Sequence, residues 1–185
     1  DFRVLSITVD QEGRENIEFV PVKARAGYLA GYSDPVYVSS LTRFRLPNLP
    51  TGTYRAFEIE GDSMPPVAAG SIVIGKYVEH WRDVKNLQTY IFITKTGLAY
   101  KRVINKVKQK GYFIMLSDNA YYEPYYLPIE EVLEIWAYHA HFSFGYNQPD
   151  YVAQLKKLEE MDDVKDLKEI IEGKELKKKG EERYF

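Results

Sequence analysis

One serine and one lysine of this sequence occupy positions from which they could act together as nucleophile and base. Ser63 lies in the turn Gly61–Met64, between the end of a predicted strand and the Pro65-Pro66 pair, so its hydroxyl is free of the sheet. Lys101 lies inside another predicted strand, Leu98–Ile104. A neutral lysine amine can accept the proton of a serine hydroxyl and so activate the oxygen. Backbone N–H groups of the serine turn could then face a developing oxyanion.

The residues around Lys101 predict a lowered pKa for its amine. On an extended strand Lys101 shares a face with Ala99 and Val103, while Tyr100 and Arg102 point to the other face. An apolar face disfavours the charged form of lysine, so its pKa falls below the usual value of about 10.4. At the usual value only about one amine in two thousand is neutral at pH 7. We therefore expect desolvation to make Lys101 a usable base.

The composition is that of a folded, soluble domain and excludes several chemistries. Of 185 residues, 45% are hydrophobic and 28% are charged, which is a globular composition. The net charge of -2 makes the chain a poor candidate for binding nucleic acid by charge alone. The lack of cysteine excludes disulfides, a thiol nucleophile and cysteine-bound zinc. With no long apolar run and no signal peptide, we expect no membrane span and a cytoplasmic location.

Short predicted strands dominate the middle of the chain and must position the serine and the lysine. Glycine, proline or asparagine separates them, and they cover Tyr54–Ile59, Ser71–Tyr77, Tyr90–Thr94, Leu98–Ile104, Tyr112–Leu116 and Val132–His141. Lys95-Thr96-Gly97 predicts a hairpin between the third and fourth of these strands. Many short strands with such turns are typical of a mainly-β domain that is rolled or barrel-like.

The segments before this core show weaker patterns. Phe2–Val9 and Ile17–Val22 predict a strand pair around the turn Asp10–Gly13. The small residues of Ala24–Gly31 predict an accessible, pliable segment. Ser33–Pro50 contains three prolines, which predict a loop with one short extended stretch at most.

The composition changes again after Gly145. Asp150 and Asp163 can each cap a short amphipathic helix, and the charged stretch Lys174–Phe185 predicts a frayed tail. The apolar series would drift around one straight helix, so two short helices fit it better than a coiled coil.

Four stretches resemble the LexA and lambda-type repressor family of self-cleaving serine peptidases. They are Val22–Gly27, Glu60–Met64, Tyr100–Val103 and Ser117–Pro124. These look like the family's cleavage segment with its Ala-Gly bond, its Gly-x-Ser-Met turn, its strand with the base lysine, and its asparagine-containing loop. The resemblance runs from about Val20 to Ala137. One such stretch would be weak evidence, but four in the family's order and spacing are specific.

The resemblance implies a LexA-type peptidase fold and a role for each matching residue. Ser63 is the expected nucleophile, Lys101 the general base, and Ala26-Gly27 the scissile bond. The amide N–H groups of Asp62 and Ser63 are expected to form the oxyanion hole. Family members fold their own Ala-Gly bond into the site, and its cleavage inactivates the repressor. The resemblance implies no cofactor and no metal ion.

It also implies partners and a domain organisation. We expect a homodimer, operator DNA bound by a helix-turn-helix domain outside this chain, and a RecA filament on single-stranded DNA as co-effector of an SOS response. Residues 1–22 would be a strand pair and linker from the missing DNA-binding domain, 23–145 the peptidase and dimerisation domain, and 146–185 a helical C-terminal extension. A non-cleaving dimerisation and sensing module, and a UmuD-like accessory protein of a polymerase, remain open as alternatives.

Some residues leave further alternatives open. Ala30-Gly31 is a second Ala-Gly pair, although the spacing and Val22 favour Ala26-Gly27 as the scissile bond. His139 and His141 share a strand face, but without a third ligand nearby a structural role is expected rather than a metal site. No motif supports a Ser-His-Asp triad with His80.

Overall fold

Strands make up most of the regular structure in residues 5–144, the part of the chain that this computed structural model describes. Nine strands form one mixed sheet in the order β2-β1-β3-β4-β9-β5-β6-β7-β8. They are β1 (Ile17–Val20), β2 (Thr42–Phe44), β3 (Tyr54–Glu58), β4 (Ile72–Tyr77), β5 (Thr89–Thr94), β6 (Gly97–Asn105), β7 (Tyr112–Leu116), β8 (Tyr125–Pro128) and β9 (Val132–Phe142). The prediction of a mainly-β domain is confirmed.

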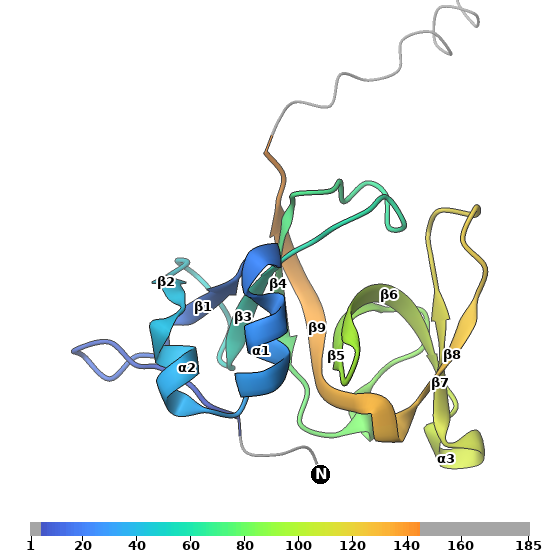
Figure 1. The fold of residues 1–185 in the computed structure, drawn as a ribbon, viewed down its shortest axis with the longest axis horizontal. Coiled ribbons are helices and arrows are strands. Elements are labelled where there is room, and N and C mark those ends of the chain that lie inside the picture. The colour runs from blue at the N-terminus through green and yellow to red at the C-terminus, as the bar shows by residue number, and fades with distance from the viewer. Residues whose placement is uncertain (1–4, 145–185) are drawn as a thin grey trace, which may run out of the picture. The chain divides into compact units, whose positions relative to one another are not determined.

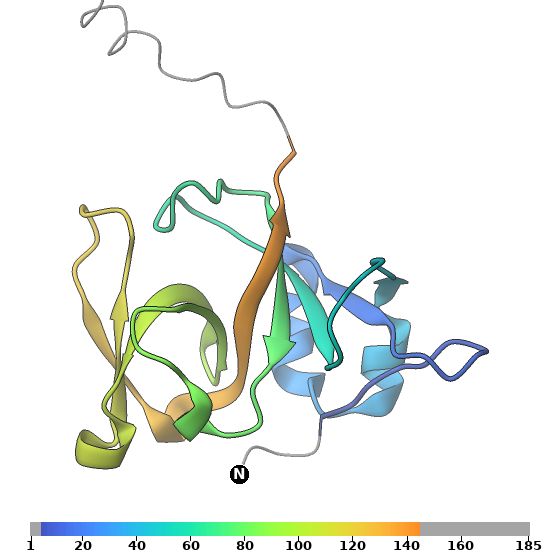
Figure 2. The same cartoon turned by 180° about the vertical axis from the view of Figure 1, so that it is seen from behind.

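Short helices connect these strands. The α-helices are α1 (Arg25–Gly31), α2 (Pro35–Ser40) and α3 (Val107–Lys110), and single 3₁₀ turns cover Val22–Ala24, Trp81–Asp83 and Ile129–Glu131. Figures 1 and 2 show α1 and α2 next to each other, on one face of the part of the sheet that contains β1, β3 and β4. No described helix has the length and apolar character needed to cross a membrane.

The long strand β9 joins the two halves of the sheet. From Val132 to Ala137 it pairs with β5, and from Trp136 to Phe142 it pairs with β4. In Figure 1 it runs as one curved ribbon between the β3–β4 half and the β5–β8 half. The hairpin of β5 and β6 then places Lys101 directly opposite Tyr90.

Two apolar clusters fill the interior next to the site. The first lies between α1 and the sheet, where the ring of Phe57 packs edge-on against Tyr28 and Trp136, with centroids 5.9 and 5.6 Å apart. The second lies within the β5–β8 half, where the rings of Phe92 and Phe113 are 5.1 Å apart. Burial of such large rings supplies most of the stabilisation of a domain of this size.

The six strands predicted for the core are all present, and none of their ends differs by more than one residue. The hairpin around Lys95-Thr96-Gly97 is present as well. One further strand, β8, is not among the predicted strands; it begins just after Pro124 and ends at Pro128. Because β8 is an edge strand paired with β7 alone, proline at its end removes no needed ladder bond.

The strand pair predicted near the N-terminus is present only in part: its second strand, Ile17–Val22, forms as β1, but its first strand does not form. Within residues 5–9 no strand forms, and Val9 makes only an isolated bridge to Glu15. The reason is that the N–H and the hydroxyl of Thr8 both donate to the buried carboxylate of Glu18, at 2.9 and 2.6 Å. The carbonyl of Thr8 accepts from the N–H of Asn16, but its N–H is bound by a side chain, so no continuous ladder forms here.

No domain boundary falls near residue 22, where the sequence analysis placed one. β1 pairs in parallel with β3 and antiparallel with β2, so it belongs to the same sheet as the core. The chain divides between Phe144 and Gly145, within one residue of the second predicted boundary. The two helices and the tail predicted for residues 146–185 lie outside the described residues.

The segments predicted to be pliable or looped contain two helices. Asp34 caps α2 by accepting a hydrogen bond from the N–H of Val36 at 2.9 Å. In α1, Gly27 and Gly31 lie one turn apart and allow Tyr37 of α2 to approach. A Cβ atom on Gly27 would lie 2.8 Å from the Tyr37 hydroxyl, and one on Gly31 would lie 3.0 Å from its ring. The small residues therefore serve a close helix contact, which the local sequence pattern does not reveal.

Candidate active site

The structure brings the serine and the lysine together. Ser63 lies in the turn after β3, and Lys101 lies in the middle of β6. The amine Nζ of Lys101 is 2.5 Å from Ser63 Oγ and 3.0 Å from Ser117 Oγ, and donates a hydrogen bond to each. It also lies 5.4 Å from the centre of the Tyr122 ring. A neutral amine in this position would accept the hydroxyl proton of Ser63 instead.

The surroundings of Lys101 favour its neutral form. Ala99 and Val103, two residues away on either side, pack with the β5–β8 cluster, while Tyr100 belongs to the cluster beneath α1. Burial lowers the pKa of the Lys101 amine from its usual value near 10.5. Among the described residues no carboxylate lies within salt-bridge distance to counter this effect. Within residues 5–144 the amine is thus held by two hydroxyl groups and lies near an aromatic ring, and no ion pair holds it.

The turn that carries Ser63 is held in place from both sides. Gly61 has φ of 77°, a left-handed conformation that glycine adopts without strain. Met64 is buried in the cluster beneath α1 and anchors the end of the turn. Asn119 donates its backbone N–H to the carbonyl of Ser63 at 3.1 Å and its side-chain amide to that of Asp62 at 3.2 Å. These bonds fix the orientation of the peptide groups around the nucleophile.

The same contacts orient the expected oxyanion donors. The carbonyl and the N–H of one trans peptide point in opposite directions, so the bond from Asn119 to the Asp62 carbonyl turns the N–H of Ser63 away from Asn119. Within residues 5–144 neither Asp62 nor Ser63 gives its amide N–H to a protein acceptor. Both groups are therefore available to an oxyanion, and their role as its donors stays a prediction.

Charged side chains brace the loop Ser117–Pro124 against β6. Arg102, next to Lys101 but on the other face of the strand, forms two hydrogen bonds of 2.7 Å with Asp118. This bidentate contact lowers the pKa of Asp118. Tyr122 donates its hydroxyl to the carboxylate of Asp62, which raises the tyrosine pKa. Two of the four stretches that resemble the LexA family, the serine turn and this loop, are thus in direct contact.

A cleft of about 250 Å³ opens beside the serine and the lysine. It is lined by Arg25, Ile59, Glu60, Ser63, Leu98, Ala99, Tyr100, Lys101 and Tyr125. Arg25 is the first residue of α1, and its guanidinium Nη1 is 2.5 Å from Glu60 Oε2. The start of α1 therefore contributes a side chain to the cleft.

The expected scissile bond lies in a helix. Ala26-Gly27 is the bond between the second and third residues of α1, and both residues are exposed. Ala30-Gly31 ends the same helix. The structure brings Arg25 to the cleft but holds both Ala-Gly bonds in helical conformation. A peptide attacked by a serine has to be extended across the nucleophile, so cleavage at either bond would require α1 to unwind first.

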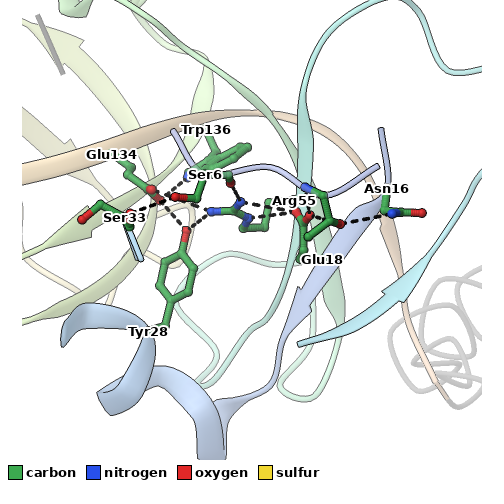
Figure 3. A network of polar contacts seen from close by, with 9 residues as sticks. Ser6, Asn16, Glu18, Tyr28, Ser33, Arg55, Glu134 and Trp136 are labelled. Carbon is green, nitrogen blue, oxygen red and sulfur yellow. Dashed lines mark hydrogen bonds and ion pairs between the residues drawn. The ribbon is translucent and has the colours of Figure 1, made fainter. Parts of the chain in front are cut away.

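A buried polar network fastens α1 to the sheet (Figure 3). Tyr28 of α1 donates its hydroxyl to Glu134 at 2.5 Å and accepts a hydrogen bond from Arg55 at 2.6 Å. Arg55 also donates to Glu18 at 3.3 Å and to the carbonyl of Ser6 at 2.6 Å. Burial raises the pKa of Glu134 and raises that of Tyr28 well above its usual value. The side chains of the network are almost completely buried; they belong to Glu18, Tyr28, Arg55 and Glu134.

Sequence reasoning missed this network, although it left a signal. Arg55, Glu18 and Glu134 each interrupt an otherwise apolar or aromatic strand segment. A charged residue in such a place more often faces water than a buried partner, so the local pattern alone did not predict that the three meet. Ser117 and Arg25, two further residues around the reactive pair, lie inside two of the four motif stretches, but the sequence analysis assigned neither of them a role of its own.

The histidines take part in ordinary contacts. His139 packs its ring on Tyr54, with centroids 5.1 Å apart, and His141 shares a hydrogen bond of 2.9 Å with Tyr138. Within residues 5–144 no three histidine, cysteine or acidic side chains are grouped so that they could hold a metal ion.

No protein-family model matches this chain, and no curated protein matches it either. The interpretation of the site therefore depends on its geometry and on the four motif stretches.

Proposed function

We propose that this domain is a serine peptidase of the LexA type that cleaves its own chain at Ala26-Gly27 and forms the regulatory half of a stress-responsive repressor. The observation that carries the proposal is the distance of 2.5 Å between Lys101 Nζ and Ser63 Oγ. The lowered pKa of Lys101 supports it, because a base must be neutral before it can take a proton.

The reaction follows from these groups. Neutral Lys101 accepts the proton of Ser63 as Oγ attacks the carbonyl carbon of Ala26, and the N–H groups of Asp62 and Ser63 bind the oxyanion. The tetrahedral intermediate expels the amine of Gly27, which takes the proton from Lys101. Water, deprotonated by the same lysine, then attacks the ester, and the lysine returns that proton to Ser63 Oγ as the ester bond breaks and the new carboxyl group of Ala26 is freed.

The rate of this reaction is controlled by the conformation of α1. The helix contains two glycines in seven residues, and Gly27, which is not at its end, lowers helix stability by about 1 kcal/mol relative to alanine. Opposing this, Tyr28 is buried and hydrogen-bonded to Arg55 and Glu134. Self-cleavage thus becomes a slow event that any partner able to release α1 would accelerate. A RecA filament is the partner that the resemblance suggests.

Incubation of the purified chain at mildly alkaline pH tests the proposal. Mass spectrometry should find fragments 1–26 and 27–185, and neither Ser63→Ala nor Lys101→Met should produce them. Fragments 1–30 and 31–185 would move the scissile bond to Ala30-Gly31. An intact chain under all conditions, with Ser63→Ala behaving like the parent, would rule out self-cleavage.

The helical state of Ala26-Gly27 favours one rival function, a dimerisation and sensing module that keeps the fold without cleaving. This module predicts an intact chain even with RecA filaments, and a dimer by light scattering. A repressor and a UmuD-like polymerase accessory would both cleave, and they differ in the presence of an operator-binding domain in the full gene product.

A further inference from the structure

We propose that the cleft contains a subsite for the guanidinium group of the residue directly before the scissile alanine. The subsite consists of the carboxylate of Glu60 and the backbone carbonyl of Glu58, and Arg25 occupies it in this structure. The inference rests on the proposed function and specifies its substrate: a segment in which arginine precedes Ala-Gly.

Arg25 is held by two acceptors and is mostly buried. Its Nη1 is 2.5 Å from Glu60 Oε2, and its Nη2 donates to the carbonyl of Glu58. The arginine side chain is only 17% exposed, whereas that of Glu60 is 59% exposed. Its Nε is buried without a partner among the described residues. A surface arginine that merely solvates a helix would not be enclosed in this way.

The two acceptors belong to the backbone segment that carries the nucleophile. Glu58 ends β3, Glu60 follows two residues later, and Ser63 lies three residues further on. Arg25, Ser63 and Lys101 also line the same cleft. A side chain bound at the acceptors is therefore already beside the reactive pair.

The chain geometry allows Arg25 to stay bound while the bond after Ala26 moves. Arg25 is the first residue of α1, and consecutive Cα atoms lie about 3.8 Å apart. Unwinding that begins at Ala26 would leave the arginine side chain in place and let the next peptides extend along the cleft. The guanidinium thus acts as the fixed point about which the segment rearranges.

Arginine suits this subsite better than lysine does. The guanidinium is planar and presents several N–H donors in a fixed fork, so it can serve a carboxylate and a carbonyl together. The ammonium of lysine is a single compact charge and would satisfy one acceptor well. We expect the order of preference arginine, lysine, glutamine, with about tenfold between the first and the last, as expected for one charge-assisted hydrogen bond.

Peptides added to a variant with an empty subsite test the inference separately from catalysis. The full chain carrying Arg25→Gln and Ser63→Ala cannot cleave, and its own residue 25 no longer fills the subsite. Labelled peptides of the sequence of residues 20–32, with arginine, lysine or glutamine at position 25, are titrated in by fluorescence anisotropy. The arginine peptide should bind about tenfold more tightly than the glutamine peptide, and adding Glu60→Gln should remove the difference. The control Glu130→Gln removes an exposed carboxylate that does not line the cleft, and it should leave the difference between the two peptides unchanged.

The outcomes separate the two proposals. Equal binding of the three peptides would overturn the subsite even if the chain cleaves itself. A preference for arginine that depends on Glu60 would support the subsite even if Ser63 proves inactive. With Ser63 restored, the arginine peptide should also be cut faster at Ala26-Gly27. If Arg25→Gln does not fold, self-cleavage of the Glu60→Gln and Glu130→Gln chains decides instead: equal rates in both would overturn the subsite.

Discussion

At the scale of single residues, Ser117 gives the amine of Lys101 a second fixed partner. It directly follows β7 and lies 3.0 Å from Nζ, whereas Ser63 comes from the turn after β3. An amine bound at two points keeps its lone pair aimed at the nucleophile when it loses a proton. Ser117 is therefore a positioning residue for the base.

Ser117→Ala should slow self-cleavage about fivefold, since it removes one neutral hydrogen bond worth about 1 kcal/mol. Ser117→Thr keeps the hydroxyl and should retain most of the rate. Ser39→Ala, an exposed serine on α2, serves as the control. Densitometry of the fragments over time gives the rates, and unchanged rates for Ser117→Ala across the pH range would exclude a positioning role.

Burial of Lys101 also predicts how pH acts on cleavage and on stability. The rate should rise with pH and level off above the lowered pKa, below the usual 10.5. Burying the charged amine destabilises the folded state; this cost is complete below the folded pKa and disappears as pH approaches 10.5. In a Ser63→Ala background, Lys101→Met should therefore be the more stable chain at neutral pH, by a margin that shrinks with rising pH. Urea denaturation at several pH values measures this margin, and a constant margin would contradict the desolvation argument.

At the scale of elements, α1 combines two opposing features. It contributes Arg25 to the cleft and contains the expected scissile bond, yet its one fully buried residue, Tyr28, ties it to the sheet. The close contact of Gly27 and Gly31 with Tyr37 adds a second attachment, to α2. Contacts of Tyr28 with the sheet and of the two glycines with Tyr37 thus hold the helix in place, although its glycine content favours unwinding.

Tyr28→Phe tests whether this attachment restrains cleavage. The ring stays, but Arg55 and Glu134 each lose a partner, so the free energy of unfolding should fall by about 1–3 kcal/mol. Self-cleavage should become several times faster, because α1 leaves the sheet more often. Thermal denaturation and fragment analysis measure both effects, with the exposed Tyr126→Phe as control. Slower cleavage would mean that the network positions the segment instead of restraining it.

At the scale of the whole molecule, Arg55 connects parts of the chain that are distant in sequence. From β3 it reaches Glu18 in β1, Tyr28 in α1 and the carbonyl of Ser6, and it lies 3.8 Å from Glu134 in β9. Its side chain is fully buried. The guanidinium compensates the carboxylates of Glu18 and Glu134, whose side chains are only 1% and 3% exposed.

Arg55→Met should lower the free energy of unfolding by about 3–5 kcal/mol, because it leaves buried carboxylates without their cation. The exposed Arg43→Met should change it by less than about 0.5 kcal/mol. Urea denaturation followed by tryptophan fluorescence gives both values, since Trp136 lies against Arg55. Similar losses for the two variants would show that the network is not a main support of the fold.

Much of the fold could be predicted because strands and turns have recognisable local sequence patterns. Alternation with period two, and turns marked by glycine and proline, place the six predicted core strands, including β7 at Tyr112–Leu116. The two edge strands and the N-terminal region were harder. β2 and β8 are short, and residues 5–9 follow buried side chains instead of a strand partner. The conformation of these segments depends on contacts with residues far away in the chain.

Sequence by itself determined the mainly-β architecture, through the pattern of short strands and turns, and it identified Ser63 and Lys101 as a pair through the resemblance of the four motif stretches to the LexA family. Only the tertiary structure decided that Ser117 is the second partner of the amine, that Arg25 fills the cleft, and that the Ala26-Gly27 bond lies in a helix. The physical reason is that the pKa, the burial and the partners of a side chain depend on atoms that folding brings together from distant parts of the chain. A local sequence pattern does not show which atoms these are.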